Sequence, residues 1–172
     1  MRLSVTLDLP TDPHAAALML SDPAYVDQKV RASGSLEHHV DVTGSPEDAF
    51  TVTTRRAMPT DQIPGHLRNL VGNQIDVRLV EAWEAAAADG SRVGTVVVEI
   101  AGAPVRLSGR TALVANGAHR STVTYDGELR ATVPIFGSAI EQAAAGAIRS
   151  ALQVEQDVAN RWITGHGQAP QP

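Results

Sequence analysis

The chain has 172 residues, of which 43% are hydrophobic, and this size and composition suit one domain that buries a sizeable core. Its formal net charge of -5 gives no reason to expect a nucleic acid or an anionic membrane as partner, because both are bound through clustered basic side chains. The chain has no cysteine, which excludes disulfides, cysteine nucleophiles and thiolate metal sites.

The first residues, MRLSVTLDLP, alternate apolar and polar side chains instead of forming the apolar block of a secretory signal. No stretch approaches the roughly 18 consecutive apolar residues that a membrane-spanning helix needs. We therefore expect a cytoplasmic protein with no stable membrane insertion and no nucleic-acid partner.

The same alternation predicts that the chain opens with a strand, whose apolar side carries Leu3, Val5, Leu7 and Leu9. Two short helices should follow, because the dipeptide Asp-Pro occurs at residues 12–13 and again at 22–23. This dipeptide is typical of a helix start, since the carboxylate caps the first turn and proline needs no hydrogen bond there.

Alternation returns between Leu36 and Val133 and predicts six further strands. Turn signals rich in Gly, Pro, Asn and Asp separate them at residues 43–48, 87–90, 101–104 and 115–119. These breaks are too short for parallel crossovers, so neighbouring strands should pair antiparallel. Residues 59–73 are an exception, and predict a short helix or a lid closed by Gly72.

A long final helix is predicted from about Ser138 to Thr164, because Ser138 and Glu141 have capping-box spacing. Residues 165–172 should form a disordered tail. The helical period predicts an apolar face of Ile140, Ala143, Ala144, Ala147, Ala151, Val154, Val158 and Trp162. The segment AIEQAAAGAIRSAL at 139–152 puts alanine where large side chains are usual, so either the helix packs very close or a hollow remains.

One strand, two short helices, six antiparallel strands and one long helix form an α+β layout in which a single helix covers a curved sheet. Over residues 2–164 this layout resembles the helix-grip fold of the START-like superfamily, which includes lipid-transfer domains, the birch-pollen allergen family, polyketide cyclases and aromatases. The resemblance implies one START-like domain at 1–164, with a seven-stranded curved antiparallel sheet around the C-terminal helix.

Four segments point to a narrower resemblance: RRAMPTDQIP (55–64), VEAWEA (80–85), GTVVVEIAGAPVRLSG (94–109) and VPIFGSAIE (133–141). They are similar to an uncharacterised, mainly actinobacterial branch of the superfamily, a domain of unknown function. This resemblance implies a fold and carries over no catalytic residue.

In a helix-grip fold the ligand cavity lies between the sheet and the long helix. The strand and helix periods predict a lining of Leu36, His38, Val52, Thr54, Leu79, Val96, Val98, Leu107, Thr111, Val123, Tyr125, Ala144, Ala147, Ile148, Ala151 and Glu155. Most of these side chains are apolar, and the few polar ones could orient a ligand. They also have a structural interpretation, since threonine is common in strands and Glu155 could extend to water.

The sequence predicts no metal or cofactor site. His38 and His39 are neighbours in a strand, so they point to opposite faces, and the charged side chains at 37, 39 and 41 share the solvent face. No H-E-x-x-H, nucleophile-elbow or phosphate-binding motif occurs. An acid–base pair of His38 with Glu81 or Tyr125 is the enzymatic possibility left open.

The sequence therefore favours a binding module that holds a hydrophobic small molecule or lipid between the sheet and the long helix. Two alternatives stay open: a cyclase- or aromatase-like enzyme that uses the same cavity, and an interaction protein with a filled core and no ligand. A hollow beneath the alanines favours the first two, because empty apolar volume destabilises a protein by about 24 cal/mol per Å³.

Overall fold

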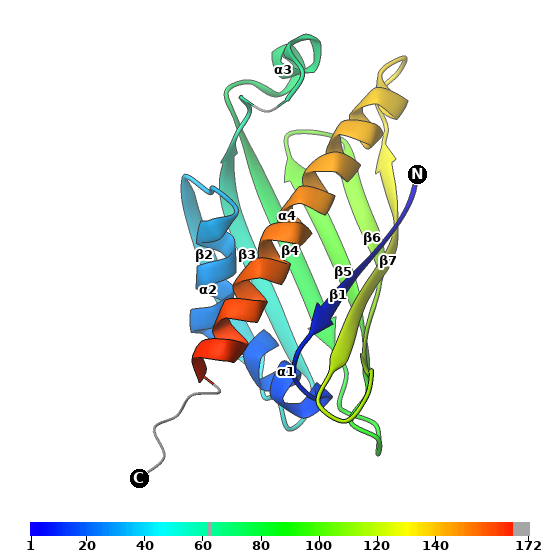
Figure 1. Cartoon of the computed structure of the whole chain (residues 1–172). Coiled ribbons are helices and arrows are strands. Elements are labelled where there is room, and N and C mark those ends of the chain that lie inside the picture. Colours follow the sequence, from blue (N-terminus) through cyan, green and yellow to red (C-terminus); the bar gives the residue numbers. More distant parts are fainter. Residues whose placement is uncertain (62, 167–172) are drawn as a thin grey trace.

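The computed structural model describes residues 1–61 and 63–166, and these form one seven-stranded antiparallel sheet in the order β1-β7-β6-β5-β4-β3-β2 (Figure 1). The strands are β1 (Arg2–Leu9), β2 (Glu37–Gly44), β3 (Phe50–Pro59), β4 (Gln74–Trp83), β5 (Arg92–Ala101), β6 (Val105–Ala115) and β7 (Ser121–Ala131). Consecutive strands from β2 to β7 are neighbours, and β1 pairs with β7. The predicted strands and their antiparallel pairing are confirmed.

Two short helices, α1 (Pro13–Leu20) and α2 (Pro23–Ala32), follow β1 as predicted. The carboxylate of Asp12 accepts hydrogen bonds from the backbone N–H groups of His14 and Ala15, and that of Asp22 accepts one from Ala24. Each helix therefore begins with a side-chain cap followed by proline at its first position.

The long helix α4 (Gly137–His166) crosses the concave face of the sheet diagonally, with α2 beside its C-terminal half (Figure 1). It packs mainly against α2, β1 and β7. The predicted capping box does not form, because the Glu141 carboxylate accepts from the Ala131 N–H and the N-terminal amine instead. The predicted tail begins two residues too early, since 165 and 166 belong to α4, and residues 167–172 lie outside the described residues.

Two close approaches of the backbone fit the curvature of the sheet. A Cβ atom on Gly94 would lie 2.3 Å from the carbonyl oxygen of Ala82, and one on Gly109 would lie 2.3 Å from that of Asp126. A side chain therefore does not fit at either position, and glycine lets neighbouring strands bend closely together. Gly109 is also paired with Gly127, so at this row β6 and β7 place no side chain on the concave face.

The helix α3 (Gly65–Val71) connects β3 to β4 and stands at one end of the sheet (Figure 1). Leu67 is buried and Gly72 ends the helix with a positive φ of 77°, which favours glycine. The prediction of a short helix within residues 59–73 is thus confirmed. None of the described helices is long and apolar enough to cross a bilayer.

Candidate functional site

The concave face of the sheet has two ends that differ in burial. At the end near α1, which we call the closed end, the inward side chains of Phe50, Val52, Leu113 and Val123 are buried. At the end near α3, which we call the open end, inward apolar side chains of β4 and β5 are only half-buried: Val77, Leu79, Val98 and Ile100. The part of α4 that crosses the open end contributes the half-buried Ile140, Ala144 and Ile148.

A buried group of charged side chains lies between α2, α4 and the sheet. The Lys29 ammonium lies 2.8 Å from Oε1 of Glu155 and 3.5 Å from Oε2 of Glu81. The exposed fractions of Lys29, Glu81 and Glu155 are only 8%, 3% and 9%. We call these three residues and Arg56 the interior charged cluster.

The cluster forms because three distant elements each turn one side chain inward. Tyr25 and Lys29 are four residues apart, so they lie on the same face of α2. Glu155 lies on the buried face of α4, and Glu81 is an inward residue of β4. Burial would lower the pKa of Lys29, but attraction to Glu155 and Glu81 outweighs it and raises the pKa, so Lys29 stays charged.

Arg56 completes the charge balance of the cluster from β3. Its guanidinium donates a hydrogen bond to the Ser33 hydroxyl at the end of α2, at 3.2 Å. Burial lowers the pKa of Arg56, while the carboxylates of Glu155 and Glu81 oppose that effect. The cluster therefore contains two cations and two carboxylates, and its formal charge is zero.

Both tyrosines of the chain border this cluster. Burial raises the pKa of Tyr25 well above 10.0, with further contributions from Glu155 and Glu81. The pKa of Tyr125 is raised well above 10.0 by burial and by the same two carboxylates. Neither hydroxyl makes a well-formed hydrogen bond among the described residues, although Glu155 and Glu81 lie nearby. Tyr25 is also held by Trp162, whose ring meets it edge-on at 5.6 Å.

Further polar atoms are buried on the concave face without a hydrogen-bond partner among the described residues. They are the indole Nε1 of Trp83 and the hydroxyls of Thr54, Thr111 and Ser121. Buried polar atoms usually have partners, because an unmade hydrogen bond costs about 1–3 kcal/mol. These atoms are therefore positioned to bind a ligand or water.

His38 does not form the acid–base pair that the sequence left open. Its Nε2 lies 2.8 Å from Oδ1 of Asp27, and its Nδ1 lies 3.4 Å from the Ser35 hydroxyl. The hydrogen bond with His38 is the main cause that lowers the pKa of Asp27. His38 thus fastens β2 to α2, at the edge of the concave face.

The predicted lining residues fall into three groups. The buried ones are Val52, Thr54, Val96, Leu107, Thr111, Val123, Tyr125 and Glu155, and the half-buried ones are His38, Leu79, Val98, Ala144, Ile148 and Ala151. The other two, Leu36 and Ala147, are exposed, and the inward orientation predicted for Ala147 is wrong. Leu36 precedes β2 and is 59% exposed, and Ala147 is also exposed.

The buried face of α4 is centred on Ala145, Leu152, Glu155 and Ala159 rather than on Ala147. Alanine occupies positions 143, 144, 145 and 147, so hydrophobicity alone does not distinguish the inward positions from the outward ones. Larger side chains in this stretch would have fixed the orientation.

Sequence reasoning missed Tyr25, Lys29 and Arg56. One signal was available, because Lys29 lies among the apolar residues Val26 and Val30 of a short helix. A lysine on an apolar face needs a carboxylate partner, and Glu155 was already predicted to face the core. Pairing the two would have identified the cluster.

A groove of about 370 Å³ lies between β1 and α4, at the edge of the concave face. The Gln156 amide spans this seam, accepting from the Asp8 N–H and donating to the Asp8 carbonyl. The groove is therefore the place where α4 is fastened to the edge of the sheet.

Several solved structures share this fold at low sequence identity. Human STARD10 aligns with a TM-score of 0.59 and 10% identity, over 99% of this chain and 73% of its own. The Zhui aromatase/cyclase of a Streptomyces species aligns with a TM-score of 0.55 and 11% sequence identity, over 92% of this chain and 90% of its own. A START superfamily protein from Mycobacterium smegmatis aligns with a TM-score of 0.50 and 13% sequence identity, over 90% of this chain and 97% of its own. These likenesses confirm the helix-grip fold.

No curated protein matches the chain by sequence. A family model does, and it covers nearly the whole domain. The match, to the family described as "Protein of unknown function (DUF2505)", extends over residues 4–163, and the chain therefore belongs to that family.

Proposed function

We propose that this protein binds a hydrophobic small molecule or a lipid between the sheet and α4, and that the ligand reaches its site through the open end. The observation that carries the proposal is the change in burial along single strands. In β4, Leu79 is half-buried, whereas Trp83, on the same face and nearer the closed end, is 2% exposed. Apolar side chains that face a helix yet stay half-buried are suited to an apolar ligand.

The shared fold supports this proposal, because the START-like resemblance implies that a ligand cavity, where one exists, lies between the sheet and the long helix. In this proposal α3 acts as a gate to the open end. The protein acts in the cytoplasm of an actinobacterial cell. A gate should open locally, so the amides of α3 should exchange hydrogen faster than those of β5. Equal protection of the two segments would rule the gate out.

An enzymatic role is the second candidate. The fold is shared with the Zhui aromatase/cyclase, and Tyr125 lies beside the Glu81 carboxylate in the interior. A tyrosine next to a carboxylate can relay a proton during a reaction. If the wild-type protein converts a bound ligand, and Tyr125→Phe still binds that ligand but no longer converts it, the enzymatic candidate is favoured over a binding module.

The binding proposal is tested by titration with N-phenylnaphthylamine, an uncharged apolar fluorophore. Phenylalanine at position 144 should fill the open end from α4, so Ala144→Phe should weaken binding at least about tenfold. Phenylalanine at position 147 projects from the exposed side of the same helix, so Ala147→Phe is the matched control and should bind like the wild type. Absence of binding to the wild-type protein, or equal binding by both variants, would contradict the proposal.

A further inference from the structure

We infer that the ligand's polar end is an uncharged hydroxyl or carbonyl group, held in the row of residues Trp83, Gly94, Thr111 and Tyr125. These residues lie side by side on the concave face of β4, β5, β6 and β7, as the strand register shows. The inference rests on the proposed function and names the chemistry of the ligand that the same site takes. We call this set the polar row.

The polar row combines buried hydrogen-bonding atoms with a position that has no side chain. Trp83, Thr111 and Tyr125 are 2%, 1% and 8% exposed; the Trp83 indole and the Thr111 hydroxyl have no hydrogen-bond partner among the described residues, and the Tyr125 hydroxyl lies beside the Glu81 carboxylate. Gly94 lies between Trp83 and Thr111 in the register. The indole N–H donates and the hydroxyls both donate and accept, so together they match a hydroxyl or carbonyl group.

Between the polar row and the open end, β6 and β7 have glycine on the concave face. The next row toward α3 contains Gly109 and Gly127, which place no side chain on the concave face, together with the buried Glu81 of β4 and Val96 of β5. The row beyond it contains the half-buried Leu79 and Val98. An amphiphile can therefore lie with its apolar part against the open end and its polar end against the polar row.

The charge balance of the interior argues against a charged polar end. The interior charged cluster already pairs Lys29 and Arg56 with Glu81 and Glu155, beside the polar row. Arg92, the other buried cation among the described residues, donates to loop carbonyls of Asp48 and Glu84 at the closed end. A carboxylate, phosphate or ammonium group from a ligand would be left without a counter-charge, which is strongly unfavourable in a buried site.

Three amphiphiles with the same alkyl chain provide the test: decanol, decanoate and decylamine, titrated by calorimetry at a pH of about 7, where the acid is anionic and the amine cationic. Decanol should bind at least about tenfold more tightly than either charged compound. Thr111→Val and Tyr125→Phe should each weaken decanol binding about fivefold to tenfold. Thr124→Val, on the opposite face of β7, is the matched control and should bind decanol like the wild type.

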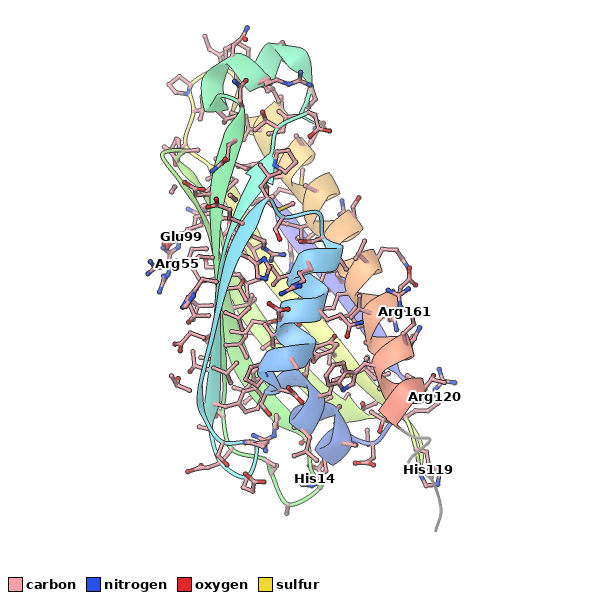
Figure 2. The ribbon with its side chains drawn as sticks, turned by 90° about the vertical axis from the view of Figure 1, so that its left-hand side faces the viewer. His14, Arg55, Glu99, His119, Arg120 and Arg161 are labelled. Atoms are coloured by element: carbon pink, nitrogen blue, oxygen red, sulfur yellow. The ribbon has the colours of Figure 1, made fainter. Side chains whose placement is uncertain are left out.

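A charge variant makes the test sharper. Glu81→Gln gives the interior one excess positive charge, so decanoate binding should improve relative to decanol. Glu99→Gln is its control, because Glu99 lies on the outer face of the sheet with Arg55 (Figure 2). Unfolding transitions of all variants show whether each is folded at the temperature used.

The outcomes separate this inference from the proposed function. If N-phenylnaphthylamine binds but decanoate or decylamine binds as tightly as decanol, the inference is wrong and the binding site stands. The same conclusion follows if Glu81→Gln leaves the preference between decanol and decanoate unchanged. If neither the fluorophore nor any of the three amphiphiles binds, both the inference and the proposed function are overturned.

Discussion

The open and closed ends of the concave face belong to the same strands yet are covered differently. At the closed end α1, α2 and the C-terminal half of α4 supply buried side chains such as Leu20, Val30 and Val158. At the open end the N-terminal half of α4 supplies mainly alanine, and the inward apolar residues of β4 and β5 stay half-buried, whereas Leu107 and Leu129 of β6 and β7 are buried. The strand pattern alone therefore does not determine burial on a sheet face. The elements that cover each end of the face also contribute to it.

The alanines of the segment at 139–152 differ in how deeply they are buried. Ala145 is 1% exposed, whereas Ala144 is half-buried and Ala147 faces solvent. Neighbouring alanines thus have three different surroundings. A buried alanine at position 145 and a half-buried one at position 144 are thus present within one turn of α4.

Removing Lys29 should have the largest effect on stability. Lys29→Met leaves the carboxylates of Glu81 and Glu155 buried without their cation, which should destabilise the fold by about 3–5 kcal/mol. Arg31→Met removes an exposed cation of the same helix, paired with Asp27, and should cost less than about 1 kcal/mol. Urea unfolding measures the change in the free energy of unfolding for both variants. Similar losses in the two variants would mean that the interior charged cluster is not buried.

Truncating matched leucines should distinguish the two ends. Leu113 is fully buried at the closed end, so Leu113→Ala should cost about 3 kcal/mol by leaving a cavity. Leu79 is half-buried at the open end, and Leu79→Ala should cost about 1 kcal/mol, since less apolar surface returns to water. Urea unfolding of the ligand-free variants gives both values, and an equal cost would remove the distinction between the ends.

An alkaline titration should report the surroundings of both tyrosines. Their pKa values are raised in the folded protein, mainly by burial, while unfolded tyrosines ionise near about pH 10. Folding is therefore favoured fully below about pH 10 and loses that contribution as the pH rises further. Tyrosinate absorbance should appear only together with loss of the folded circular dichroism signal. Tyrosines that ionise near pH 10 in the folded protein would contradict their placement.

Leucine substitutions on α4 should change the stability differently at each of three alanine positions. Ala145→Leu should cost about 1–3 kcal/mol by overpacking a filled site. Ala144→Leu should be neutral or slightly stabilising without ligand, because the added methyl groups occupy space at the open end. Ala147→Leu should be neutral. Thermal unfolding orders the three variants, and a clear loss in Ala144→Leu would show that the open end is filled.

Most of the fold was predictable from the sequence because the signals are local. Period-two alternation predicted the strands, and Asp-Pro dipeptides predicted the starts of α1 and α2. The buried polar residues Thr54, Thr111, Tyr125 and Glu155 were likewise predicted to face inward. Each of these predictions depends on residues that are close together in the chain.

The parts that were not predicted depend on contacts between distant residues. Lys29 and Glu155 are separated by 126 positions, and no local pattern joins them. Lysine is normally exposed, so a buried lysine is recognised only once its partner is known. The predicted inward orientation of Ala147 was wrong for another reason. A run of alanines has no strongly apolar side, so the sequence does not show which side of α4 faces the sheet.

Native mass spectrometry of the protein purified from its own host tests the central claim, that a ligand occupies the space between the sheet and α4. The account predicts a population heavier than the polypeptide by the mass of one small organic molecule, which is lost after organic extraction. Ala144→Phe should lower that population and Ala147→Phe should not. A spectrum that shows only the mass of the bare polypeptide under gentle ionisation, in the wild type as in both variants, would contradict the account.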